Sequence, residues 1–200
     1  MNMRKITRAL ISVSDKANLT GLVASLHSHG VEIISTGGTF KAIQQVGIPV
    51  IPVSDFTGSP EVMDGRVKTI HPKIAGGILF RREETNDWYA LGQLGGKPID
   101  LVVVNLYPFR EKVAAGASHA EIVENIDIGG PSLLRAAAKN YDDVAVITEP
   151  GDYIRLMTQL DANDGQTELA FREECAGKAY TLTAAYDKEI AKYFASCQAR

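Results

Sequence analysis

The sequence predicts an α/β fold in which helices cover both faces of a mainly parallel sheet. Strand-like and helix-like segments alternate over the first 150 residues, as in successive β-α-β units. Residues 101–104 form an unbroken apolar run, typical of a parallel strand buried on both faces. The chain has 200 residues, 45% of them hydrophobic, so one domain has ample material for a core. We expect a single domain over residues 1–200, with the sheet-bearing core at about 1–150 and a helical extension at about 151–200.

The first half of the chain shows the alternation clearly. Apolar runs predict three strands, at residues 6–13, 31–35 and 48–53. Prolines in the third run favour a place near the sheet edge. Apolar residues at helical spacing follow the first two strands, and Gly30 and Gly47 are suited to end those helices. Residues 54–72 form a long irregular stretch, which in a compact domain is typical of a functional loop.

The second half continues the pattern and then becomes helical. Pro72 is expected to open a short helix, and Ser118 with Glu121 fits a capping box that opens another. Pro131 suits the first residue of the helix that follows. Strands are expected at residues 99–105 and 144–148, and helices at residues 153–160 and about 169–194.

Residues 64–73 (DGRVKTIHPK) concentrate charge between two well-patterned parts of the chain. His71 precedes a proline, which biases it and the residues before it toward extended backbone. In an extended segment Arg66 and Lys68 would share a face, with Val67 pointing back toward the core. Two cations on one face suit an anion such as a phosphate. The alternative is a solvated basic loop.

Two further loops favour a phosphate site. Residues 35–39 (STGGT) follow a predicted strand and open a helix, where free backbone N–H groups and the helix dipole favour an anion. The loop matches neither a Walker A nor a complete GxGxxG motif, so it does not indicate a nucleoside triphosphate or a dinucleotide. Ser12, Ser14 and Lys16 leave the neighbouring strand. An ordinary tight turn is the alternative reading of the glycine loop.

Residues 127–130 (DIGG) set a carboxylate before a second Gly-rich helix start. Asp127 could cap the helix, but a paired glycine adds nothing to capping and suggests that a flat ligand edge approaches the backbone. In that helix Ser132, Arg135 and Lys139 should share a polar face. Lys139 lies about 12 Å along the axis from Pro131, which spacing alone would make a surface lysine.

Composition and the remaining motifs exclude several classes of function. A net charge of −3 argues against non-specific nucleic-acid or membrane binding. The two cysteines form no CxxC pair, the four histidines form no metal motif, and no catalytic GxSxG is present. The first eight residues lack a secretory pattern, and no apolar run is long enough to span a bilayer. We therefore expect a cytoplasmic protein with free thiols and no metal.

Six motifs in a fixed order resemble the inosine monophosphate (IMP) cyclohydrolase part of a bifunctional purine-biosynthesis family. They lie at residues 12–16 (SVSDK), 35–39 (STGGT), 64–73, 105–109 (NLYPF), 125–140 (NIDIGG and RAAAKN) and 183–187 (TAAYD). The resemblance covers the whole chain and implies a methylglyoxal-synthase-like three-layer α/β/α sandwich. Ala75 stands where relatives often have His. The family's larger formyltransferase part has no counterpart in this sequence, so that activity is not expected.

The resemblance also implies a reaction and site residues. The expected reaction closes the purine ring of 5-formamidoimidazole-4-carboxamide ribotide to give IMP and water, without a cofactor and in a homodimer. The implied catalytic residues are Lys68, Tyr107, Asp127 and Lys139. The implied substrate-binding residues are Ser12, Ser14, Lys16, Thr36, Gly37, Gly38, Thr39, Arg66, Thr69, Asn105, Ile128, Gly129 and Gly130. The alternatives are a methylglyoxal-synthase-type lyase and a non-catalytic nucleotide-sensing domain of the same fold.

Overall fold

The structure is a computed structural model that describes residues 3–198, apart from the side chains of Asp64 and Gln198. Over these residues, a five-stranded parallel sheet has the order β4-β3-β2-β5-β6. The strands are β2 (Arg8–Val13), β3 (Glu32–Ser35), β4 (Ile51–Pro52), β5 (Leu101–Asn105) and β6 (Ala145–Ile147). Because β2, β3 and β5 are neighbours, the loops after them meet at one edge of the sheet.

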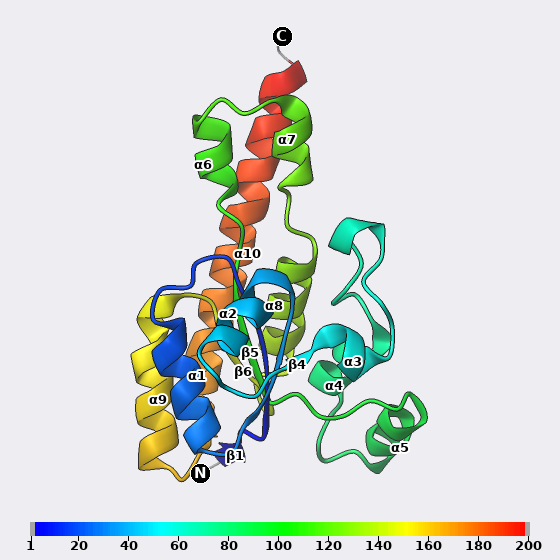
Figure 1. Ribbon diagram of the computed structural model, residues 1–200, viewed down its shortest axis with the longest axis vertical. Helices are drawn as coiled ribbons and strands as arrows, with labels where there is room; N and C mark the ends of the chain where they lie inside the picture. The colour runs from blue at the N-terminus through cyan, green and yellow to red at the C-terminus, as the bar shows by residue number, and fades with distance from the viewer. Residues whose placement is uncertain (1–2, 199–200) are drawn as a thin grey trace.

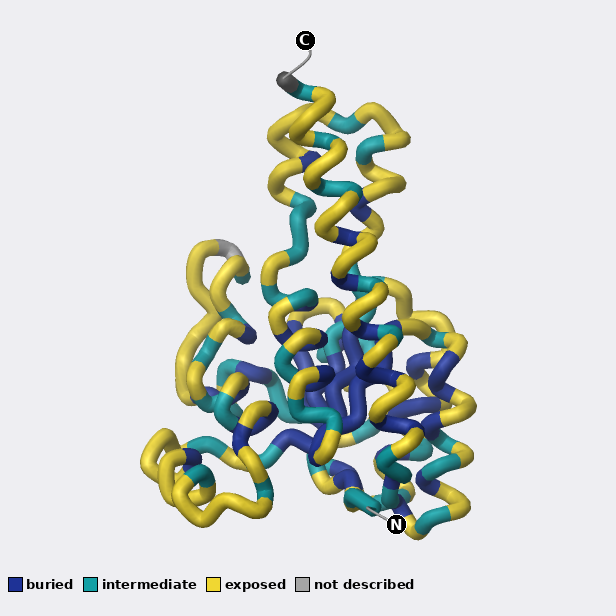
Figure 2. The backbone as a smooth tube through the Cα atoms, turned by 180° about the vertical axis from the view of Figure 1, so that it is seen from behind, coloured by how far each residue is buried: buried dark blue, intermediate teal, exposed yellow. Residues whose placement is uncertain are grey.

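Helices cover both faces of this sheet (Figure 1). On one side, α1 (Leu19–Ser28) lies beside α9 (Tyr153–Ala162), and on the other α4 (Pro72–Leu79) packs against α8 (Gly129–Lys139). The core contains the interior strands and the apolar faces of these helices, shown as the dark centre of Figure 2. Shorter helices are α2 (Gly37–Gln45), α3 (Val53–Thr57) and α5 (Thr85–Gln93), with 3-10 turns at Met63–Gly65 and Pro150–Asp152.

The long helix α10 (Leu169–Gln198) belongs to two parts of the molecule. Its first half packs on β6 and α8, and Phe171, Cys175 and Ala179 join the main core. Its second half projects beyond the sheet beside α6 (Phe109–Ala114) and α7 (His119–Glu124) (Figure 1). We call this projection the arm. Its own small core is formed by Phe109, Ile122 and Tyr186.

The predicted sheet, its parallel strands and the helices on both of its faces are confirmed. The capping box is also present, since the Ser118 hydroxyl accepts from the Glu121 N–H and the Glu121 carboxylate accepts from the Ser118 N–H. Gly77 is packed closely, because a Cβ on it would lie 2.5 Å from the Lys97 carbonyl.

Several local expectations were wrong. Helix α8 begins at Gly129, two residues before Pro131. Helices α3, α5 and α6 were not predicted, because each is short and weakly patterned. The expected helical extension also contains a strand, β7 (Gln166–Glu168), which pairs antiparallel with β1 (Met3–Lys5).

Candidate active site

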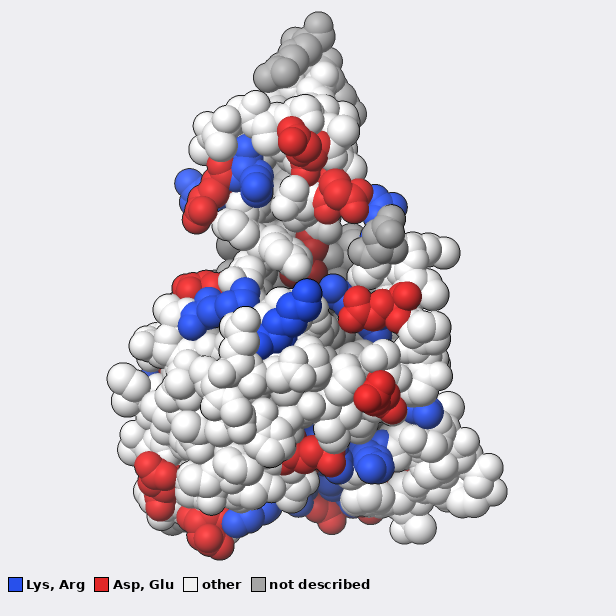
Figure 3. Space-filling model, viewed as in Figure 1, with Lys and Arg blue, Asp and Glu red and all other residues white. Residues whose placement is uncertain are grey.

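Two lysines converge on the N-terminus of α2. A methyl group placed on Gly38 would lie 3.8 Å from Lys16 Nζ, and one on Gly37 would lie 3.8 Å from Lys68 Nζ. Among the described residues, no side chain caps this helix, so the backbone N–H groups of its first turn point into the same space. Two ammonium groups beside a helix N-terminus form a site for a doubly charged anion. Figure 3 shows Lys and Arg side chains gathered over this region, below the arm.

The hydroxyl groups around this anion site are largely engaged with the protein itself. Ser12 Oγ lies 3.1 Å from Thr36 Oγ1. The buried Thr39 hydroxyl donates to the Val13 carbonyl at 2.9 Å and accepts from the Val13 N–H at 3.0 Å. Thr39 therefore offers an anion its backbone N–H, while its side chain fixes α2 to the end of β2.

Asn105 anchors the loop that carries Lys16. Its carboxamide oxygen accepts from the Ser14 N–H at 2.7 Å, from the Ser14 hydroxyl and from the Asp15 N–H, both at 2.9 Å. Its carboxamide nitrogen donates to the Asp15 carbonyl at 3.0 Å. The Asn105 and Ser14 side chains are thus engaged with each other in this structure, and they position Lys16 rather than face an open space.

Asp127 occupies the far side of the site. Its carboxylate accepts from the Gly130 N–H at 2.7 Å, and its own N–H donates to the Tyr186 hydroxyl at 2.9 Å. Burial raises the pKa of Asp127, while the N–H groups of Gly130 and Tyr107 and the charge of Lys68 partly offset that rise. A half-buried carboxylate whose pKa is raised is suited to accept a proton.

The glycine pair before α8 leaves room for two side chains of this chain. A Cβ on Gly130 would lie 2.4 Å from the Asp127 carboxylate, and one on Gly129 would lie 2.9 Å from the Thr69 hydroxyl. These close contacts within the protein are a second reason for the glycine pair, and the flat ligand edge against this backbone stays a prediction. Both glycines still serve the site, because they let Asp127 and Thr69 approach the start of α8.

Lys68 links the two ends of the site. Its ammonium lies near Gly37, and its charge acts on the Asp127 carboxylate. A ligand with an anionic group at α2 and a reacting group near Asp127 would meet Lys68 between them.

Arg66 turns away from Lys68. Its backbone is helical (φ −63°, ψ −30°) rather than extended, and its guanidinium pairs with Glu124 on α7. Val67 is 36% exposed and does not enter the core. The expected common face of Arg66 and Lys68 was therefore wrong, because Arg66 ends the 3-10 turn at Met63–Gly65 with helical backbone, and side chains alternate between two faces only in an extended segment.

The structure does not bring Lys139 to Asp127 within one chain. Lys139 is the exposed last residue of α8, about 15 Å along the axis from Gly129. The predicted faces of α8 are nevertheless confirmed, with Leu133, Leu134, Ala137 and Ala138 buried. The side chains of Tyr107 and Ile128 are 52% and 60% exposed, so they lie at the mouth of the site.

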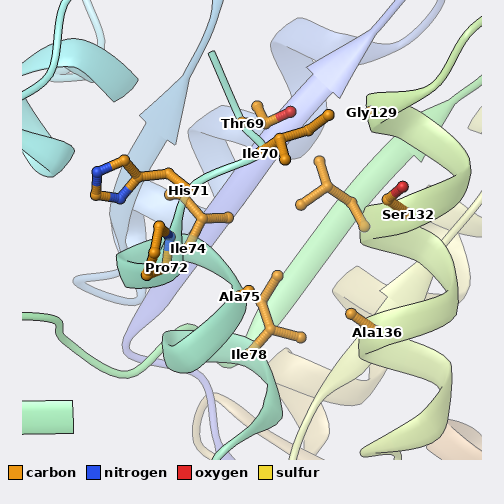
Figure 4. A pocket seen from close by; sticks show the side chains of 11 residues that line it. Thr69, Ile70, His71, Pro72, Ile74, Ala75, Ile78, Gly129, Ser132 and Ala136 are labelled. Carbon is orange, nitrogen blue, oxygen red and sulfur yellow. The ribbon is translucent and has the colours of Figure 1, made fainter. Parts of the chain in front are cut away.

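An apolar groove of about 320 Å³ extends from the site between α4 and α8 (Figure 4). Thr69 and Gly129 line one end, and Ala75, Ile78 and Ala136 line the other. The His71 ring points away from the groove, caps α4 through the Lys73 N–H and lies 3.2 Å from the Ser59 hydroxyl. His71 is therefore structural in this arrangement.

Comparison with known proteins fits this geometry. The family model described as MGS-like domain matches residues 18–132, which is more than half of the chain. The chain belongs to the MGS-like domain family. A second family model, described as AICARFT/IMPCHase bienzyme, matches residues 137–200 and confirms the resemblance seen in the motifs. The MGS-like match contains α2, Lys68 and Asp127, and the second match contains α10.

Individual relatives of this MGS-like chain include two named as bifunctional purine biosynthesis protein PurH. The one from Bradyrhizobium diazoefficiens is 53% identical over 96% of this chain and 36% of its own length. The one from Magnetococcus marinus is 50% identical over 97% of this chain and 37% of its own length. The chain thus spans about a third of the curated relatives it matches. The crystal structure of ForH is 34% identical, with a TM-score of 0.83 over 94% of this chain and 99% of that one.

Sequence reasoning gave no role to Tyr186, which bonds to the backbone of Asp127, or to Glu124, which pairs with Arg66. Tyr186 belongs to the 183–187 motif, and that motif is the sequence feature that could have indicated a role for it. Over the described residues, no cluster of His, Cys, Asp and Glu could hold a metal ion. Nor is any of the described helices long and apolar enough to cross a membrane.

Proposed function

We propose that this chain is an IMP cyclohydrolase, which converts 5-formamidoimidazole-4-carboxamide ribotide into IMP and water. The observation that carries the proposal is the arrangement of Lys16 and Lys68 at the open start of α2, with Asp127 across the site. The names of the PurH relatives and of the AICARFT/IMPCHase family model support the choice of substrate.

The 5′-phosphate would bind at α2. The backbone N–H groups of Gly37, Gly38 and Thr39 face it, and Lys16 supplies a full positive charge. Ser12 and Thr36 lie beside the site and could turn their hydroxyls to the phosphate in exchange for their mutual contact. Asn105 and Ser14 would hold the Lys16 loop in place.

The ring closure itself is intramolecular, so positioning supplies much of the acceleration. The carboxamide nitrogen attacks the formyl carbon, a carbon–nitrogen bond forms, and the formyl oxygen leaves as water after it has gained two protons. Asp127 would take the proton from the attacking nitrogen, because its raised pKa makes it a better base than an exposed Asp. Lys68 and Thr69 would donate to the formyl oxygen as negative charge develops on it.

The apolar groove beside Thr69 and Gly129 offers a place for the flat imidazole ring. Tyr107 and Ile128 at the mouth would cover the ring once it is bound. Arg66 is proposed to orient the imidazole ring of the substrate, but only after its guanidinium has broken the ion pair with Glu124. Lys139 remains a candidate proton shuttle only if a second copy of the chain supplies it, because it lies far from Asp127 in its own chain.

The direct test is turnover of the purified chain. We expect the formamido ribotide to be converted to IMP, followed by ultraviolet absorbance, with no metal added. Dihydroxyacetone phosphate should give no methylglyoxal. Methylglyoxal formation would instead support the lyase, and tight IMP binding without turnover would support a sensing domain.

The proposed function extends to assembly and location. The family resemblance supports a homodimer, and light scattering coupled to size exclusion would give its mass. We place its action in the cytoplasm, where the free thiols of Cys175 and Cys197 would stay reduced. A monomer at micromolar concentration would remove Lys139 from the mechanism.

A further inference from the structure

The hydroxyl of Tyr186 is a second anchor for Asp127, from a different part of the chain. It accepts the Asp127 N–H at 2.9 Å across 59 residues of sequence. The Asp127 carboxylate is held separately by the Gly130 N–H. The backbone and the side chain of this residue are thus fixed from two helices, α10 and α8.

The Tyr186 ring is itself held firmly. It is 9% exposed and packs edge-on against Phe109, with ring centroids 6.1 Å apart. Leu106, Ile126 and Ile190 pack against the same small core. Since both the ring and the helix that carries it are packed, the hydroxyl has little freedom to move away from Asp127.

The contact joins two segments that separate family models match. Asp127 lies within residues 18–132, the MGS-like match, whereas Tyr186 lies within residues 137–200. The long helix therefore adds to the MGS-like fold a support aimed at the residue with the proposed role of base. A helix that served only to enlarge the core would need no polar contact at this point.

We infer that Tyr186 is a positioning residue, which holds the Asp127 backbone so that its carboxylate faces the reacting amide. The inference rests on the proposed function, because it gives Asp127 a reaction to serve. It assigns Tyr186 no contact with the substrate. Loss of the hydroxyl would leave the Asp127 N–H without its partner and loosen the loop before α8, while the phosphate site at α2 stays intact.

The test compares Tyr186→Phe with Tyr193→Phe. Tyr193 belongs to the same helix and packs against the same small core, but its hydroxyl lies 2.8 Å from His119 Nδ1 on α7. Both variants remove one hydroxyl from the arm, so a purely structural role would give them similar melting temperatures and similar kinetics. The inference predicts that Tyr186→Phe lowers kcat about tenfold with KM changed less than twofold, and that Tyr193→Phe changes neither.

A second measurement is independent of turnover. Amide hydrogen exchange at Asp127, followed by NMR, should become at least about tenfold faster in Tyr186→Phe and stay at the parent rate in Tyr193→Phe. Unchanged exchange in Tyr186→Phe, or parent kcat in an active protein, would overturn the inference. An inactive parent would refute the proposed function and the assigned role together, whereas an active parent with an unimpaired Tyr186→Phe would refute the role alone.

Discussion

The Thr39 hydroxyl closes a pair of hydrogen bonds with a single residue, Val13, as donor to its carbonyl and acceptor from its N–H. Thr39→Val keeps the shape of the side chain but leaves both backbone groups unpaired in a buried place. We expect the free energy of unfolding, measured in urea, to fall by about 1–3 kcal/mol. Thr39→Ser retains the hydroxyl and should lose less. Equal losses in the two variants would show that the methyl group contributes as much to stability as the hydrogen bonds, against this expectation.

Substitutions of the two lysines at α2 should distinguish substrate binding from the chemical step. Lys16→Met should raise KM about tenfold with kcat nearly unchanged, because a bound phosphate keeps its charge through the reaction. Lys68→Met should lower kcat as well, because Lys68 also acts near Asp127. Lys97→Met is the control, since Lys97 is exposed and precedes β5 at the opposite edge of the sheet. Identical kinetics for Lys16→Met and Lys68→Met would contradict the division of roles.

The Asp127→Asn variant tests whether Asp127 acts as the general base. The amide keeps the size of the side chain but cannot take up the proton, so kcat should fall about 10²-fold or more. Asp55→Asn, on the exposed surface of α3, controls for the charge change and should retain parent kinetics. Parent-like turnover of Asp127→Asn, with a normal melting curve, would leave Asp127 as a helix-capping residue only.

The pH dependence follows from the same carboxylate. Burial raises the pKa of Asp127, so activity should be lost on acidification at a higher pH than for an ordinary Asp. The charge of Lys68 lowers that pKa, and Lys68→Met should therefore shift the acid limb of kcat to still higher pH. Kinetics of both proteins across pH 4–8 (roughly the range in which raised Asp pKa values fall) would check the direction. A shift to lower pH would rule out Asp127 as the titrating group.

A bulky side chain at Ala75 should fill the groove between α4 and α8. Ala75 is exposed and lines the groove, so Ala75→Phe should fill the space without disturbing the core. If the imidazole ring binds there, KM for the ribotide should rise about tenfold while affinity for inorganic phosphate stays constant. Ala90→Phe on the exposed side of α5 is the matched control. An unchanged KM in Ala75→Phe would indicate that the imidazole ring binds elsewhere.

Much of this architecture could be predicted because its signals are local. The strand of residues 101–105 is apolar throughout, and the capping box at Ser118 is a four-residue pattern. Loops after neighbouring parallel strands must meet, so the sequence predicts that residues near Ser14 and Gly37 lie close together. The polar face of α8 followed from spacing of 3.6 residues per turn.

The remaining features depend on contacts across long stretches of sequence. The rotation of Arg66 away from Lys68 comes from one 3-10 turn and from Glu124, 58 residues further on. The roles of Gly129 and Gly130 depend on where Thr69 and Asp127 come to rest. The engagement of the Asn105 carboxamide with Ser14 likewise depends on the register of β2 with β5. None of these can be deduced from residues considered one segment at a time.

The pairing of β1 with β7 has a consequence for the order of events during synthesis. Met3 aligns with Glu168 and Lys5 with Gln166. The first described strand, β1, therefore cannot pair until its partner strand, some 160 residues later in the chain, has been made. The parallel sheet from β2 to β6 lies between them in the chain and can form beforehand, as the ribosome adds residues. The opening strand would therefore stay unpaired until the start of α10 has emerged. Residues 3–5 would then stay open to proteases in a nascent chain until β7 has been made.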